Sequence, residues 1–418
     1  MNAMPYIGRM ADDRLERLFG ELPALMLTGP RAAGKTTTAR RHAKTVVRLD
    51  REAEATAFDA DPDSALGVLP EPVLLDEWQA VPGVLAAVKR AVDEDPRPGR
   101  FLMTGSVRAD LLGETWPGTG RVVRLRMDGL TIREIEGEST APAFVERLAT
   151  GDVDAFTLPA EVPDLRGYVR LALRGGFPEP VLRLSDEVRK AWLEGYLDQL
   201  LTRDVEGLVG ARDPDRLRRY FEALALNTAG LPEHKTLYDA AGINRKTALS
   251  YDQLLTNLFV LDSLPAWTSN RLTRLVKGAK RHLVDPSLVG AALRLDEAAV
   301  IRDGDLLGRL IETFVLAQVR PELEFLPGGA RLYHLRDRDD RREVDLLVEL
   351  AGGDIVAIEV KATAAPNSGD ARHLIWLRDT LGDRFLGGAV LHTGPRPFVL
   401  ADRISAVPIC AFWGGRSS

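Results

Sequence analysis

One contiguous stretch of the sequence combines glycines, a lysine and threonines at a spacing that could bind a phosphate chain. The pattern G-x-x-x-x-G-K-[ST] is met at every fixed position by Gly29, Pro30, Arg31, Ala32, Ala33, Gly34, Lys35 and Thr36, with Thr37 next. Glycines let the backbone turn tightly and direct successive N–H groups at phosphate oxygens. Lys35 can reach the β and γ oxygens, and the Thr36 hydroxyl can ligate Mg²⁺. The stretch predicts binding of a nucleoside triphosphate such as ATP, with Mg²⁺.

An acidic pair at the end of an apolar run supports this prediction. Asp76 and Glu77 follow the run 72–75, and a strand that delivers an acid to its carboxyl end suits a second phosphate-site element. Asp76 is predicted to hold Mg²⁺ through water, and Glu77 to polarise the attacking water. An acidic pair in isolation is more often surface charge. The matched phosphate loop favours the functional interpretation.

Two further positions are candidates for sensing or stabilising the γ-phosphate. The run 101–106 ends in polar residues, so Thr104 or Ser106 could hydrogen-bond the γ-phosphate or the attacking water; a simple strand-end turn is the alternative. Arg121 follows a Gly-rich turn and could supply positive charge to the transition state, in cis or across a subunit contact. The alternative for Arg121 is a solvated side chain.

A second constellation of charged residues lies in the last quarter of the chain. Glu312 lies in an apolar helical run, Asp345 lies inside an apolar strand, and Glu359 and Lys361 share one face of another strand. Charges in apolar strands are costly unless they are paired or bind a metal. Three carboxylates can hold one or two Mg²⁺ ions, and Lys361 can orient a water for phosphodiester hydrolysis. Lys361 paired with Asp345 or Glu359 at a sheet rim is an equally weighted alternative.

The elements that must position these residues indicate an α/β protein. Short β-rich runs alternate with helical stretches up to about residue 135, which predicts βαβ units and a mainly parallel sheet. We expect a phosphate-binding domain, a linker or insertion without clear periodicity, a helical and winged-helix-like domain, and a separate C-terminal α/β domain. The corresponding ranges are 1–136, 137–184, 185–300 and 301–418.

A candidate nucleic-acid surface lies in the helical region. The segment 237–251 has the outline of a helix-turn-helix, and a strand at 259–264 would suit a winged version. Packing of the two helices against a neighbour is the alternative. The basic residues predicted to face DNA or RNA phosphates are Arg245, Lys246, Arg271, Arg274, Lys277, Lys280 and Arg281.

Composition excludes several classes of protein. The 418 residues include 55 Lys and Arg against 61 Asp and Glu, a net charge of −6 that excludes a generally basic nucleic-acid coat. No apolar run is long enough to span a bilayer, and the first residues lack the apolar stretch of a secretory signal. A single cysteine, Cys410, excludes an internal disulfide. We therefore expect a cytoplasmic protein with no membrane partner.

These motifs in this order resemble the AAA-type ATPases of bacteria and archaea that carry a C-terminal domain of unknown function (DUF4143) with a restriction-endonuclease-like fold. The resemblance spans nearly the whole chain. It implies that Asp345, Glu359 and Lys361 form a nuclease-like signature, although position 344 is Val rather than Pro. It also makes a homo-oligomer plausible, because relatives often place an arginine across a subunit interface. The other matching segments are 29–37, 75–77, 102–106, 120–121, 203–204 and 308–315.

Two functions from different classes are compatible with these observations. The first is an ATPase that couples turnover to a nucleic-acid-directed C-terminal domain, with Mg²⁺-dependent nuclease activity as its strongest form. The second is a nucleotide-controlled switch or scaffold whose nuclease-like domain binds a partner without cleavage. A role in defence or toxin–antitoxin biology is permitted by the resemblance, but no residue indicates it.

Overall fold

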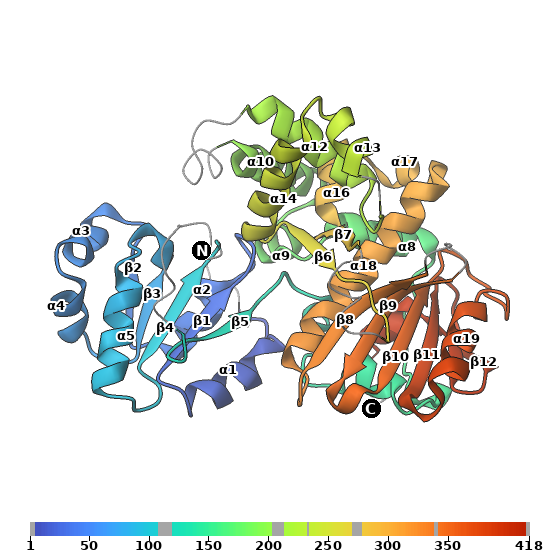
Figure 1. Cartoon of the computed structure of the whole chain (residues 1–418), viewed down its shortest axis with the longest axis horizontal. Coiled ribbons are helices and arrows are strands. Elements are labelled where there is room, and N and C mark those ends of the chain that lie inside the picture. The colour runs from blue at the N-terminus through green and yellow to red at the C-terminus, as the bar shows by residue number, and fades with distance from the viewer. Residues whose placement is uncertain are drawn as a thin grey trace.

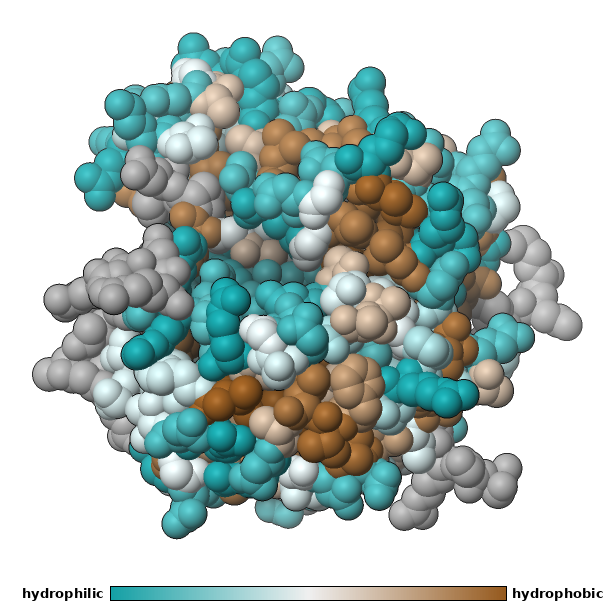
Figure 2. Space-filling model, turned by 90° about the vertical axis from the view of Figure 1, so that its right-hand side faces the viewer, coloured by the Kyte–Doolittle hydropathy of each residue, from teal (hydrophilic) through white to brown (hydrophobic). Residues whose placement is uncertain are grey.

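The computed structural model describes residues 5–107, 119–202, 213–231, 234–269, 278–337 and 342–414 (Figure 1). The two larger sheets lie apart from each other, with most of the helices of the middle segment above and between them. No helix in these ranges is long and apolar enough to cross a membrane. Figure 2, which views the right-hand side of Figure 1, shows apolar patches between larger hydrophilic areas.

The N-terminal sheet is parallel throughout, as the sequence predicts. Its strands lie in the order β2-β3-β4-β1-β5. Alternate residues of β1 enter different cores, because Leu25 and Leu27 pack with helix α1 whereas Met26 packs with helix α5. The strands are β1 (Ala24–Thr28), β2 (Thr45–Arg48), β3 (Val73–Asp76), β4 (Phe101–Gly105) and β5 (Val123–Arg126). The helices are α1 (Ala11–Phe19), α2 (Lys35–Ala39), α3 (Glu52–Ala60), α4 (Pro62–Gly67) and α5 (Val84–Glu94).

The segment after the N-terminal sheet packs on the C-terminal domain rather than forming only a connection. Phe144 stacks on Phe412 with ring centroids 4.2 Å apart, and Arg147 donates a hydrogen bond of 2.7 Å to the Ala411 carbonyl. A Cβ on Gly387 of the C-terminal sheet would lie 2.1 Å from the Leu148 carbonyl oxygen. The helices of this segment are α6 (Ile132–Ile135) and α7 (Phe144–Leu148).

In the described residues, the middle of the chain is helical apart from a hairpin of two strands. Strands β6 (Leu261–Leu264) and β7 (Lys280–Leu283) pair antiparallel, with Asp262 opposite His282. Helices α13 (His234–Ala240) and α14 (Arg245–Asn257) lie where the sequence predicts two helices joined by a turn, and β6 lies within the predicted strand. Whether the pair acts as a helix-turn-helix stays a prediction. The other helices are α8 (Leu165–Arg174), α9 (Pro178–Arg183), α10 (Asp186–Leu201), α12 (Pro214–Leu226), α16 (Ser287–Leu293) and α17 (Glu297–Arg302).

The C-terminal domain is a mixed six-stranded sheet between two helices. The strand order is β12-β13-β11-β10-β9-β8, with β10 parallel to β11 and antiparallel to β9. Val356 and Ile358 pack in the core that contains α18, whereas Ile355 and Ala357 pack in the core that contains α19. The helices are α18 (Gly304–Phe325) and α19 (Arg372–Leu381). The strands are β8 (Ala330–Arg336), β9 (Glu343–Leu350), β10 (Ile355–Val360), β11 (Phe385–His392), β12 (Phe398–Ala401) and β13 (Ile404–Pro408).

Candidate functional site

The phosphate-loop candidate lies between β1 and α2, at the carboxyl edge of the parallel sheet. Gly29 has φ +153°, and a Cβ there would lie 2.0 Å from the Met127 carbonyl oxygen, so only glycine fits without displacing the backbone. Gly34, with φ +95°, also adopts a conformation that favours glycine. The phosphate-loop motif calls for glycine at both positions, and the structure shows the reasons: a close backbone contact at Gly29 and a positive φ at Gly34.

Lys35 is buried inside this loop. Its ammonium donates hydrogen bonds to the carbonyl oxygens of Gly29 at 3.0 Å and Pro30 at 2.7 Å. Burial lowers the pKa of Lys35 to about 8, although the carboxylates of Glu77 and Asp76 act in the opposite direction. The ammonium is thus held beside the loop backbone, where a phosphate group would meet both the loop amides and a positive charge.

Asp76, at the end of β3, connects the start of α2 after the phosphate loop to the end of β4. Thr36 donates a hydrogen bond of 2.6 Å to Asp76 Oδ1, and Thr104, at the end of β4, donates to the same oxygen. The Asp76 side chain is buried at the end of β3. A hydroxyl beside a carboxylate provides oxygen donors of the type that Mg²⁺ takes together with phosphates and waters. These residues therefore fit the predicted ion.

Glu77, which follows β3, is positioned by residues at the end of β4 and by Gln79. Its backbone adopts a left-handed conformation with φ +55°, and its N–H donates to Thr104 Oγ1 at 3.3 Å. Ser106 donates to Glu77 Oε2 at 3.2 Å, and the Gln79 side-chain amide also donates to that oxygen. The sequence singled out Thr104 and Ser106. It carried no signal for Gln79, which matches no motif.

Arg9 is a second residue that the sequence did not indicate. Its guanidinium donates to the carbonyl oxygens of Ala33 at 3.0 Å and Asp128 at 2.8 Å, and to Glu134 at 2.9 Å. One side chain before β1 therefore ties the phosphate loop to the segment that follows β5. Only tertiary structure brings these partners together, because Glu134 lies 125 residues further along the chain.

Arg121 lies away from the phosphate loop within the chain. Val123 pairs with Leu25 at the start of the strands, and Arg126 pairs with Thr28 beside the loop. At about 3.3 Å per residue, roughly 15 Å of strand separates Arg121 from the loop. Its exposed guanidinium pairs instead with Asp93, at the end of α5. A role for Arg121 in cis does not fit this geometry, because the two strands are parallel.

The C-terminal carboxylates converge, as the sequence alone could not show. Glu312, Asp345, Glu359 and Lys361 line one cavity of about 430 Å³. Lys361 Nζ lies 2.7 Å from Glu359 Oε1, consistent with the predicted shared face. Burial raises the pKa values of Glu312 and Glu359 to about 8, and the Asp345 carboxylate adds to both rises. We call this cavity the acidic pocket.

Lys280 occupies the acidic pocket and corrects two predictions. Its Nζ lies 2.8 Å from Glu312 Oε1 and 2.9 Å from Asp345 Oδ1, and its side chain is 3% exposed. Lys280 is therefore buried among carboxylates and does not present its charge to nucleic-acid phosphates. Within the described residues, no group of three or more His, Cys, Asp or Glu side chains is arranged to hold a metal. The predicted metal centre of Glu312, Asp345 and Glu359 does not fit while the ammonium lies between two of them.

The remaining basic residues divide into three groups. Arg245 and Lys246 are exposed at the start of α14, as a phosphate-contacting role requires. Arg281 is largely buried and donates a hydrogen bond of 2.6 Å to Asp252. The prediction that Arg281 faces nucleic-acid phosphates is therefore corrected, because Asp252 already compensates its charge. The other three predicted contacts, Arg271, Arg274 and Lys277, lie outside the described residues.

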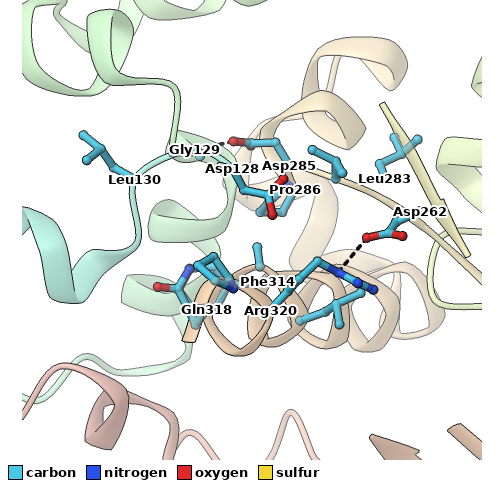
Figure 3. Close-up of a pocket in the computed structure, with 16 residues that line it drawn as sticks. Asp128, Gly129, Leu130, Asp262, Leu283, Asp285, Pro286, Phe314, Gln318 and Arg320 are labelled. Carbon is cyan, nitrogen blue, oxygen red and sulfur yellow. Dashed lines mark hydrogen bonds and ion pairs between the residues drawn. The ribbon is translucent and has the colours of Figure 1, made fainter. Parts of the chain in front are cut away.

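A buried charge cluster connects the three parts of the molecule. Asp262 on β6 pairs with Arg320 on α18 at 2.6 Å (Figure 3). Asp262 also pairs with Arg126 on β5 at 3.2 Å. Arg126 also pairs with Asp128 at 2.9 Å. Burial alone would raise the pKa of Asp262, but the two guanidinium groups outweigh it and lower the pKa to about 2. We call these four residues the junction cluster.

The fold and the loop define the class of protein. A parallel sheet with a phosphate loop after β1 and an acid at the end of β3 is typical of a P-loop domain of the AAA type, and the family model described as an AAA domain matches residues 21–136. Two domains of unknown function match further along, DUF8612 over residues 165–299 and DUF4143 over residues 307–412.

The chain belongs to the family of AAA-type ATPases that carry a C-terminal DUF4143 domain, which confirms these two parts of the resemblance. The restriction-endonuclease-like fold of the C-terminal domain stays a prediction. Its relatives include the uncharacterized protein Rv2008c of Mycobacterium tuberculosis, 32% identical over 407 residues, which cover 96% of this chain and 83% of the relative. The uncharacterized protein Mb2031c of Mycobacterium bovis gives the same values. A solved structure, protein VC1899 from Vibrio cholerae, aligns at 13% identity over 89% of each chain with a TM-score of 0.19, too low to bear on the fold.

Proposed function

We propose that the N-terminal domain binds ATP and hydrolyses it with Mg²⁺. The observation that carries this proposal is the hydrogen-bonded cluster of Thr36, Asp76 and Thr104 beside the buried Lys35. It joins the phosphate loop to the ends of β3 and β4, where a γ-phosphate would lie. Thr36 and Asp76 would hold Mg²⁺, which when bound would supply positive charge that neutralises the charge developing on the phosphates.

Each residue of the cluster has a distinct role in this proposal. Lys35 binds the β and γ oxygens, and Thr36 and Asp76 hold the ion, Asp76 through water. Glu77 orients and polarises the attacking water, while Ser106 and Gln79 keep its carboxylate in place. Thr104 contacts both Asp76 and the Glu77 backbone, a suitable position for sensing the γ-phosphate.

The first test separates binding from hydrolysis. Glu77→Gln keeps the shape of the side chain but removes the carboxylate, so we expect turnover of ATP to fall by about 10²- to 10⁴-fold, the usual share of a general base. Binding of ATP, measured by calorimetry, stays within about threefold of the parent, because no phosphate contact is lost. The matched control is Glu52→Gln on the exposed face of α3. Unchanged turnover in Glu77→Gln would contradict the assigned role.

We further propose that nucleotide turnover is coupled to the C-terminal domain. The Met127 carbonyl lies against Gly29 of the phosphate loop, and Arg126 and Asp128 flank Met127 in the junction cluster. Asp262 of the same cluster lies on the hairpin that carries Lys280 into the acidic pocket. A shift of the loop on nucleotide binding would therefore act on a continuous set of buried contacts.

For the C-terminal domain, the position of Lys280 favours a nucleotide-controlled switch or scaffold that binds a partner without cleavage. Partner affinity should then differ between the ATP and ADP states, and equal affinities in both would refute this function. The competing function is a nucleic-acid-directed nuclease, and the convergence of Asp345, Glu359 and Lys361 favours it. That function requires metal-dependent cutting of DNA or RNA that disappears in Asp345→Ala and in Lys361→Ala. Contact with nucleic acid would then involve Arg245 and Lys246.

A further inference from the structure

The acidic pocket receives its central cation from another part of the chain. Lys280 lies on β7 of the hairpin, not on the C-terminal sheet, and its ammonium reaches carboxylates of α18 and β9. Three carboxylate oxygens lie close to Nζ: Glu312 Oε1 at 2.8 Å, Asp345 Oδ1 at 2.9 Å and Glu343 Oε1 at 3.2 Å. Three carboxylate oxygens therefore surround one buried positive charge.

A lysine ammonium and a divalent cation both bind carboxylate oxygens and compensate their negative charge. A buried carboxylate is costly unless a positive charge compensates it, and this pocket holds several. Calcium lies about 2.3–2.6 Å from its oxygen ligands, so the three oxygens around Nζ would need to contract by about half an ångström to hold such an ion. A second feature points to a cation as well: Glu359 Oε2 is buried and has no hydrogen-bond partner among the residues that the structure describes.

We propose that Lys280 is the built-in occupant of a latent divalent-cation site, and that its ammonium excludes the ion from the acidic pocket. With Lys280 in place, the pocket takes no divalent cation. Without the ammonium, Glu312, Asp345 and Glu343 form an oxygen site for Mn²⁺ or Ca²⁺, with Glu359 at its edge. This inference does not rest on the proposed ATPase activity, because it concerns the nucleotide-free chain.

The test is a gain of metal binding. Lys280→Met removes the charge but keeps most of the aliphatic stem, and a Thr36→Ala background removes a predicted ligand of the nucleotide-site ion. In nucleotide-free protein, titration with Mn²⁺ followed by electron paramagnetic resonance should show one bound ion per chain in Lys280→Met, at least about tenfold tighter than in the background protein. The matched control is Lys89→Met, which removes a lysine from an exposed ion pair with Asp93 and should gain no site.

Stability gives an independent readout. Lys280→Met leaves repelling carboxylates in a buried pocket, so its thermal midpoint should fall, and millimolar Mn²⁺ or Ca²⁺ should raise that midpoint by several degrees. The midpoint of the Lys280-containing background should not respond to the ion. If Lys280→Met is recovered only when Mn²⁺ is present during expression and purification, that result also shows that the stability of the variant depends on the ion.

Three outcomes would overturn the inference. One is a folded Lys280→Met chain that binds no more Mn²⁺ than the background. Another is a background protein that binds one Mn²⁺ and loses it in Asp345→Asn, because the ion would then coexist with the lysine. The third concerns Lys280→Arg, which keeps a positive charge and should gain no site; tight Mn²⁺ binding by that variant would show that the charge of Lys280 does not exclude the ion.

Discussion

The phosphate loop and the acidic pocket are built differently: the loop comes from one short segment, whereas the pocket comes from residues far apart in the chain. The loop is one contiguous segment, and its donors are backbone amides and a lysine whose partners lie five and six residues away. The acidic pocket is assembled from side chains of α18, β9 and β10, and its cation comes from a hairpin 32 residues before Glu312 and 65 residues before Asp345. A site built from backbone groups of one segment is specified by the local sequence. A site built from compensating side-chain charges depends on how the whole chain folds.

The largest expected effect concerns the acidic pocket. Burial would raise the pKa of Asp345, but Lys280 and the Val360 N–H outweigh it and hold the pKa below its usual range. Asp345→Ala leaves the Lys280 ammonium with one carboxylate fewer, so we expect a loss of about 3–5 kcal/mol in the free energy of unfolding. The matched variant is Asp63→Ala, which breaks an exposed pair with Arg90 and should cost less than about 1 kcal/mol. Equal losses, measured by denaturant unfolding, would remove the contrast between buried and exposed charge.

The junction cluster between the two sites predicts a pH dependence. Because the pKa of Asp262 is lowered to about 2, its ionised form stabilises the fold above about pH 4, and this stability is lost as the pH falls toward 2. The contribution is about 2–3 kcal/mol. Unfolding of the parent and of Asp262→Asn at a series of pH values should therefore show a difference that shrinks in this window. If the difference in unfolding free energy stays constant over this pH range, the contribution of Asp262 to stability does not come from its charge.

The phosphate loop should respond to a change of one backbone position. Gly29→Ala forces the loop away from the Met127 carbonyl, and we expect ATP affinity to fall by about 10- to 100-fold, as for backbone strain of 1–3 kcal/mol. Gly83→Ala is the matched control, because a Cβ there meets nothing within 4 Å. If both variants bind ATP like the parent, by calorimetry, the loop does not depend on this close approach.

The smallest effect is expected for Arg121. Its exposed pair with Asp93 lies at the opposite edge of the sheet from the phosphate loop, so Arg121→Ala should change ATP turnover by no more than about twofold. A loss of tenfold or more, compared at low and high protein concentration, would place this arginine at the site of a neighbouring subunit instead.

Local features of the fold were predictable because short-range patterns control them. The parallel N-terminal sheet follows from buried apolar runs between helices, and the loop conformation follows from its glycines. The contact between Glu359 and Lys361 follows from their spacing on one strand. The roles assigned to Asp76, Glu77 and Thr104 stay predictions, although the structure places the three residues together.

Partners that are distant in the chain could not be predicted. Arg9 and Gln79 carry no motif, yet each contacts a residue or loop of the nucleotide-site candidate. Lys280 belongs by sequence to a basic stretch, so charge counting placed it on a nucleic-acid surface. Its partner Glu312 is specified only by how the hairpin packs on α18.

The sequence by itself therefore determined the phosphate loop, the α/β character of both ends of the chain and the family, because neighbouring residues and periodic burial encode these features. Tertiary structure alone decided which charges compensate one another: Arg126 with Asp262, and Lys280 with Glu312 and Asp345. The physical reason is that a buried charge is tolerated only beside its counter-charge, and the chain brings such partners together only when it folds.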